Sequence, residues 1–116
     1  MNRKDLAFIF LIGGLAFVFG WFGIDKFVHP TLWMGFLPPW MDGFLGISKT
    51  VWIVIVGASE ILLALMILIP VRMIRQLGAA FMGIHLLGVL WQLGWNDIAV
   101  RDIGLLTGSI ALLLLI

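Results

Sequence analysis

The chain has 116 residues, of which 63% are hydrophobic and 11% charged, and its formal net charge is +1. A soluble domain is nearer half apolar and a quarter charged, and a soluble core of this size could not bury so much apolar surface. The composition excludes an intrinsically disordered chain and, without a basic surface, a nucleic-acid-binding module. The lack of cysteine excludes disulfides and thiol chemistry. The apolar composition predicts that the chain lies in a lipid bilayer.

Four apolar segments fit in the chain, because a membrane helix needs about 20 mostly apolar residues. We expect a single domain, residues 1–116, folded as an all-α integral membrane protein with an antiparallel four-helix bundle. The first apolar segment is too long for a cleaved signal peptide, and bulky and charged residues follow it. In chain order, the predicted spans cover residues 6–23, 48–69, 73–94 and 97–116.

The connection between the first two spans, residues 24–47, is unusually apolar for a loop. Proline and glycine interrupt it too often for another span. We expect residues 27–47 to form a broken helix that lies along one membrane face, as short amphipathic segments do. This segment is either a structural collar or a lid over the mouth of the bundle.

Local signals mark the ends of the later helices. Ser48 can cap the second helix, and Pro70 should end it. Gly94 suits a left-handed residue after the third helix, and Asn96 or Asp97 can cap the fourth. The last connection is therefore short, and the third and fourth helices should be antiparallel neighbours.

The basic residues predict the orientation, because cytoplasmic loops carry more of them. One side of the predicted bundle has four and the other three, which places both termini on the cytoplasmic side of a bacterial or archaeal cytoplasmic membrane. The tryptophans gather toward the opposite side, either as an aromatic belt or as the wall of a site that opens there. The four basic residues are Arg3, Lys4, Arg72 and Arg75, and the tryptophans are Trp21, Trp33, Trp40, Trp52, Trp91 and Trp95.

Two ionisable residues, Glu60 and His85, lie deep inside the predicted spans. At about 1.5 Å per residue from the turn near Val71, their depths differ by about 4–5 Å, so both lie near the midplane. Gln92 follows His85 by seven residues and lies on nearly the same helix face. A charge at this depth costs at least about 2.5 kcal/mol, so we expect Glu60 and His85 to carry protons or, alternatively, to lock the bundle as a hydrogen-bonded pair.

A second polar group is predicted near the outer end of the bundle. Arg101 lies one turn into the fourth helix, on the face of Gly104 and Gly108, and would reach into the mouth of the bundle. The alternative is an interfacial ion pair that only fixes the helix ends. The group comprises Asp25, Lys26, Asn96, Asp97, Arg101 and Asp102, with Asp25 or Asp102 as the expected partner of Arg101.

Small residues four apart let helix backbones approach closely in a membrane. Such pairs indicate packing within the bundle or, as the alternative, the seam of a homo-oligomer. They are Gly104/Gly108, Ala16/Gly20 and Ala79/Gly83. No metal or haem is expected, because the two histidines, His29 and His85, lie at different predicted depths. The sequence also has no nucleotide-binding fingerprint.

Three segments carry a more specific pattern: residues 19–30, which include Gly-Ile-Asp-Lys-Phe, then Gly57–Ile61, and Arg101–Leu105. Together they resemble the DoxX family of small four-helix membrane proteins, over essentially the whole chain. The resemblance implies a membrane bundle associated with respiratory or sulfur redox chemistry, as in the quinone-reducing thiosulfate oxidation of the DoxD type. It also implies functional roles for Lys26, Glu60, Arg101 and Asp102.

Two classes of function follow. In the first, the chain is a redox protein, at most the membrane subunit of a quinone-linked oxidoreductase. This subunit holds a quinone or another lipophilic carrier, and a partner protein supplies the electrons. The second is a non-catalytic assembly factor, chaperone or accessory protein, and a small-solute transporter is a weaker third. In the first class Glu60 and His85 carry protons, and the ligand contacts Trp21, Asp25, Lys26, Trp91, Gln92, Arg101 and Asp102.

Overall fold

The computed structural model describes residues 2–93 and 96–116, and the elements in these ranges are all helical. Four helices are long and apolar enough to cross a membrane, as the sequence predicts, which indicates an integral membrane protein. They are α1 (Arg3–Val28), α3 (Lys49–Leu68), α4 (Arg72–Leu93) and α5 (Asp97–Leu115).

The segment between α1 and α3, residues 29–48, is here called the collar. It contains the short helix α2 (Pro30–Trp33) and three 3-10 turns, η1 (Met34–Phe36), η2 (Pro39–Met41) and η3 (Phe44–Gly46). The frequent proline and glycine residues explain this interrupted helix, because proline removes a backbone donor and Gly43 takes a left-handed conformation with φ 86°.

Helix α1 is longer at both ends than the predicted span of residues 6–23. Asn2 and Asp5 form a capping box in which the Asn2 side chain accepts the Asp5 backbone N–H at 2.9 Å, so the helix begins at Arg3. At the other end it continues through Asp25 and Lys26 to Val28. The helix therefore extends beyond the predicted end at residue 23. The charged side chains of Asp25 and Lys26 do not end it, because Lys26 is buried on its inner face.

The later helix ends follow their local signals. Ser48 accepts the Val51 N–H at 3.4 Å at the start of α3, which ends two residues before Pro70. Asn96 accepts the Ala99 N–H at 2.9 Å and is the cap of α5. The predicted left-handed Gly94, like Trp95, lies outside the described residues.

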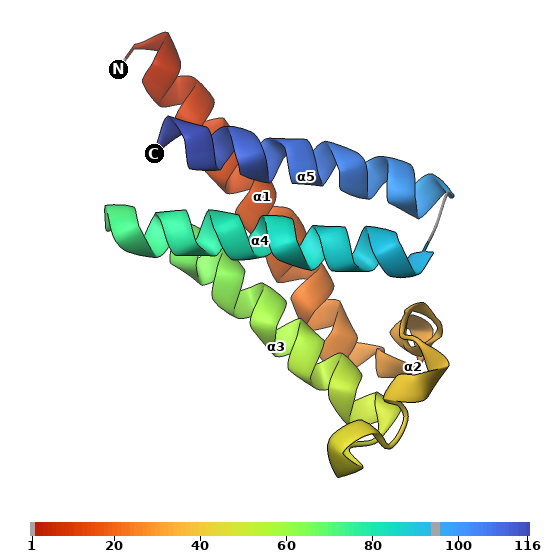
Figure 1. The fold of residues 1–116 in the computed structure, drawn as a ribbon. Coiled ribbons are helices and arrows are strands. Elements are labelled where there is room, and N and C mark those ends of the chain that lie inside the picture. Colours follow the sequence, from red (N-terminus) through yellow and green to blue (C-terminus); the bar gives the residue numbers. More distant parts are fainter. Residues whose placement is uncertain (1, 94–95) are drawn as a thin grey trace.

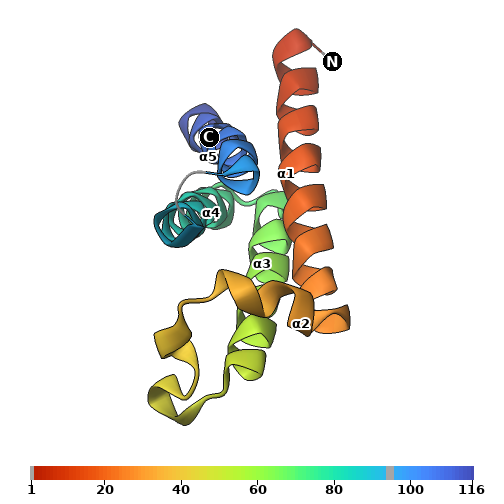
Figure 2. The ribbon, with the colours of Figure 1, turned by 90° about the vertical axis from the view of Figure 1, so that its right-hand side faces the viewer.

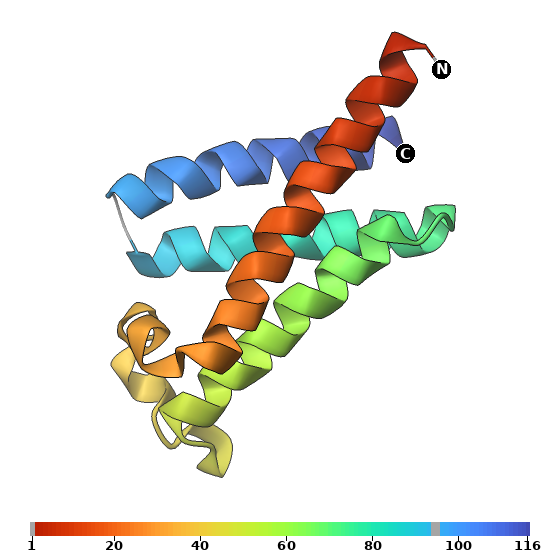
Figure 3. The same ribbon diagram turned by 180° about the vertical axis from the view of Figure 1, so that it is seen from behind.

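The long helices form two pairs that cross each other. Helices α1 and α3 lie side by side, and α4 and α5 form a second pair that runs across them (Figures 1 and 3). Both termini lie at the same end of the molecule as the connection between α3 and α4 (Figure 1). The collar lies at the opposite end of α1 and α3, and its η1 turn contacts both α3 and α4 (Figure 2).

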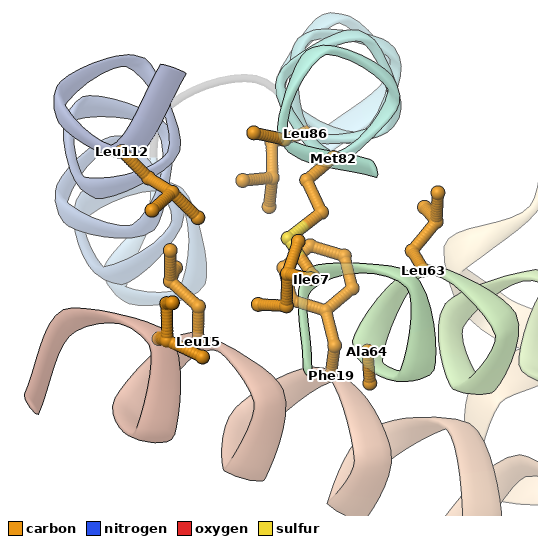
Figure 4. Packing of buried hydrophobic residues seen from close by; sticks show 10 residues of the cluster. Leu15, Phe19, Leu63, Ala64, Ile67, Met82, Leu86 and Leu112 are labelled. Carbon is orange, nitrogen blue, oxygen red and sulfur yellow. The ribbon is translucent and has the colours of Figure 1, made fainter. Parts of the chain in front are cut away.

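The apolar core lies where the two pairs meet. Buried side chains from all four long helices point toward one another there (Figure 4). Within a bilayer, such packing stabilises by close van der Waals contact, because lipid tails remove the hydrophobic driving force between helices. The cluster comprises Ile12, Leu15, Phe19, Leu63, Ala64, Ile67, Ala79, Met82, Leu86 and Leu112.

The closest backbone approach joins α1 to α3 at Gly23 and Gly57. A Cβ atom added to Gly23 would lie 2.8 Å from the Gly57 carbonyl oxygen, and one added to Gly57 would lie 2.8 Å from that of Gly23. Gly104 and Gly20 make no close helix contact within the chain, since a Cβ at either position would meet nothing within 4 Å, and the alternative of a homo-oligomer seam stays a prediction. Gly83 and Gly108 do face neighbouring helices, at Ser109 and Leu15 respectively.

Candidate functional site

Three charged side chains are buried on the inner faces of different helices. Lys26 on α1 is 7% exposed, Glu60 on α3 is 6% exposed and Asp102 on α5 is 3% exposed. Lys26 continues the inward-facing row of Ile12, Leu15, Phe19 and Gly23, with spacings of three or four residues. Each charge would be costly alone in hydrocarbon, so these helices must bring partners together.

Glu60 is the centre of the arrangement. The Lys26 ammonium nitrogen lies 2.6 Å from Glu60 Oε1, and His85 Nε2 lies 3.7 Å from Glu60 Oε2. At this distance the Lys26 ammonium pairs with Oε1. The His85 distance exceeds that of a hydrogen bond, so Oε2 keeps hydrogen-bonding capacity inside the protein.

Arg101 and Asp102 form the second part of the site. The Arg101 Nε and Nη2 atoms donate to the same Asp102 oxygen at 3.2 and 3.0 Å. The inner face of α5 carries Asp102, with Ala99, Ser109 and Leu112. The Gly104/Gly108 face is not inward as a whole, because Gly104 is exposed and only Gly108 faces another helix. Arg101 instead approaches from the side, over the ring of Phe22 at 4.6 Å.

A cavity of about 90 Å³ brings these groups together. Its walls are mainly apolar and come from α1, the collar, α3, α4 and α5, and five polar or charged side chains interrupt them. This combination of apolar walls and a few converging polar groups is typical of small-molecule sites. The five are Lys26, Glu60, His85, Arg101 and Asp102.

Trp33 of the collar covers the cavity. The Lys26 ammonium lies 4.0 Å from the centre of the Trp33 ring, which is a close cation–π contact. Asp25 holds this ring by accepting the Trp33 Nε1–H at 2.8 Å, and its other oxygen lies 3.0 Å from His29 Nδ1. Asp25 thus positions the cover of the cavity and is not the partner of Arg101.

The structure brings together Lys26, Glu60, His85, Arg101 and Asp102 but not the rest of the predicted ligand contacts. Trp91 is 91% exposed, and neither it nor the exposed Gln92 lines the cavity. Both are exposed and lie in the last turn of α4. Trp21 is 61% exposed and borders a neighbouring groove instead.

The contact between Lys26 and Glu60 was missed by reasoning from depth alone, which assigned them to separate groups. The inward-facing spacing on α1 could have revealed that Lys26 is buried. Helical side chains lean toward the N-terminus, so Lys26 points back into the molecule, where its ammonium lies 3.5 Å from the Phe22 carbonyl oxygen. No comparable sequence signal identifies Trp33 as the cover, since it depends on how the collar folds back.

Comparison of the chain with protein-family models, with curated proteins and with solved structures finds no match in any of the three. The geometry of the site is therefore the basis for assigning a function.

Proposed function

We propose that the chain is a DoxX-like membrane subunit of a quinone-linked redox system, and that its cavity holds the head of a lipophilic carrier. The observation that carries this proposal is the meeting of Lys26, Glu60 and His85 at a buried, mainly apolar cavity. The proposal includes an antiparallel arrangement of the four long helices in a bacterial or archaeal cytoplasmic membrane. It also places the end with Arg3, Lys4, Arg72 and Arg75 in the cytoplasm.

A quinone supplies a two-electron acceptor whose two carbonyl oxygens accept hydrogen bonds and take up two protons on reduction. Lys26 and His85 are suitable donors to such an oxygen, and Glu60 Oε2 is a suitable acceptor for a hydroxyl of the reduced form. His85 and Glu60 are also the groups that can pass protons to this position. A partner protein supplies the electrons.

Extraction of the purified protein with organic solvent tests the proposal. We expect a quinone in the extract of the wild-type protein. Replacement of Glu60 by Gln preserves shape while removing the charge, and a hydrogen bond to a charged group contributes about 1.5–3 kcal/mol. The Glu60→Gln protein should therefore bind the reduced form, the quinol, whose hydroxyl donates to Glu60, roughly 10–100-fold more weakly.

Asp42→Asn is the matched control, because Asp42 is an exposed collar residue outside the cavity. It should leave quinol binding unchanged. If a correctly folded Glu60→Gln protein, judged by its melting temperature, binds quinol like the wild type, the charge of Glu60 has no part in binding.

The second candidate is a non-catalytic assembly factor or accessory protein. The exposed apolar side chains of the collar favour it, because Leu45 is 75% exposed and Trp40 63% exposed, as expected of a surface that contacts a partner or lipid. In this case the charged cluster only joins the helices. A quinone-free extract, together with a protein that co-purifies unless Trp40 and Leu45 are replaced, would favour this candidate.

A further inference from the structure

A second hollow lies directly beside the cavity, between α1 and α5. Its volume is about 320 Å³, and its lining is Phe17, Val18, Trp21, Phe22, Arg101 and Leu105. Four of these six residues, all except Phe17 and Trp21, also line the cavity. The hollow, here called the groove, is therefore separated from the cavity only by side chains that both share.

The groove faces away from the protein interior. Phe17 is 68% exposed and Trp21 61% exposed, and their rings lie 6.1 Å apart along the outer surface of α1. Since α1 and α5 are helices apolar enough to cross a membrane, this surface borders hydrocarbon when the helices span it. A molecule in the groove would contact apolar side chains along its length and meet a charge only at Arg101.

The sizes of the two hollows differ in a way that limits the occupant. Small-molecule sites usually measure about 300–1,000 Å³. The groove reaches this range at about 320 Å³, whereas the cavity of about 90 Å³ does not. A ligand of ordinary size therefore needs both hollows, with its polar part in the cavity and an apolar part in the groove.

The charges favour an uncharged polar part. Lys26 is paired with Glu60 and Arg101 with Asp102, so the positive charges at the cavity are already balanced. A phosphate would add an unbalanced negative charge to this enclosed space, at a high desolvation cost. A neutral head that accepts hydrogen bonds suits these donors better.

We infer that the groove binds the hydrocarbon tail of a neutral amphiphile and is the route by which its head enters the cavity from the bilayer. The head passes between α1 and α5 at Phe22 and Arg101, whose guanidinium carbon lies 4.6 Å from the ring centre. This inference rests on the proposed function and deepens it. It assigns tail recognition to Phe17 and Trp21, the two groove residues that do not line the cavity.

Two probes separate tail binding from head binding: a benzoquinone without a tail, and the same ring with a decyl tail. Their apparent Kd values are measured for the protein in lipid nanodiscs of fixed composition. The Phe17→Ala/Trp21→Ala protein should bind the decyl probe at least about tenfold more weakly, which corresponds to about 1.4 kcal/mol. Its affinity for the tail-less probe should change less than about twofold.

Trp91→Ala is the matched control, because Trp91 is an exposed tryptophan that lines neither hollow. It should leave both affinities unchanged. Both groove residues are exposed, so the double variant should keep its melting temperature.

Equal losses for the two probes, or no loss for either, would overturn the tail groove while leaving the proposed head site intact. A double variant that loses a bound phospholipid but still binds the decyl probe normally would also overturn it. If the wild-type protein binds neither probe, the proposed quinone function itself fails.

Discussion

Along α1 and α3, the buried residues differ in character between two regions of the molecule. Near the termini they are purely apolar, as in Ile12 and Leu15 on α1 and Ile67 on α3. Farther along, the inward rows carry Lys26 near the collar end of α1 and Glu60 in the middle of α3, with Gly23 and Gly57 beside them. The two regions share a helix face but are held together differently.

The apolar region depends on shape. Each of its side chains would be almost as well solvated by lipid tails, so close packing supplies most of its stability. The charged region depends on pairing, because neither Lys26 nor Glu60 is tolerated alone away from water. Removal of a single partner should therefore damage the charged region more than a comparable truncation damages the apolar region.

Lys26→Met should cause the largest loss, because it leaves the Glu60 carboxylate buried without its cation. We expect unfolding in mixed micelles to require about 3–5 kcal/mol less than in the wild type. The exposed Lys4→Met is the control and should have little effect. The double variant Lys26→Met/Glu60→Leu should recover most of the loss, and a double variant no more stable than the single one would show that pairing is not the cause.

Leu112→Ala tests the apolar region and should have a smaller effect. Leu112 is fully buried in the core cluster, and truncation of such a side chain costs about 2–4 kcal/mol through the cavity it leaves. Leu114, which is 82% exposed on the same helix, provides the matched control. Equal effects of Leu112→Ala and Leu114→Ala in the same unfolding assay would contradict the location of the core.

Gly57→Ala tests the junction between the two regions and should have the smallest effect of the three. The added methyl group would lie 2.8 Å from the Gly23 carbonyl oxygen and 2.9 Å from Lys26 Cβ, so α1 and α3 must separate slightly. Overpacking of this kind costs about 1–3 kcal/mol. Gly20→Ala, where nothing lies within 4 Å, should be neutral or stabilising by up to about 1 kcal/mol. A Gly57→Ala protein as stable as Gly20→Ala would rule out the close approach.

The amino-acid sequence alone predicts the four long apolar helices and the caps of α3 and α5. These features depend on composition and on hydrogen bonds between residues three apart, so they need no information about distant parts of the chain. The sequence also shows that Glu60 requires a partner, because a lone charge in a predicted span is costly. The predicted membrane orientation and redox role remain predictions.

The identity of that partner depends on how the helices are placed beside one another. The collar connects the end of α1 to the start of α3. The close approach of Gly23 to Gly57 fixes the position of the two helices relative to each other. This register brings Lys26 to Glu60 and lets Trp33 cover the pair. The crossing of α4 and α5 over the first pair (Figure 1) then adds His85 and Asp102 to the cavity lining, which does not include Trp91 or Gln92. Depth along single helices cannot predict these contacts, because they depend on the rotation and crossing of each helix against its neighbours.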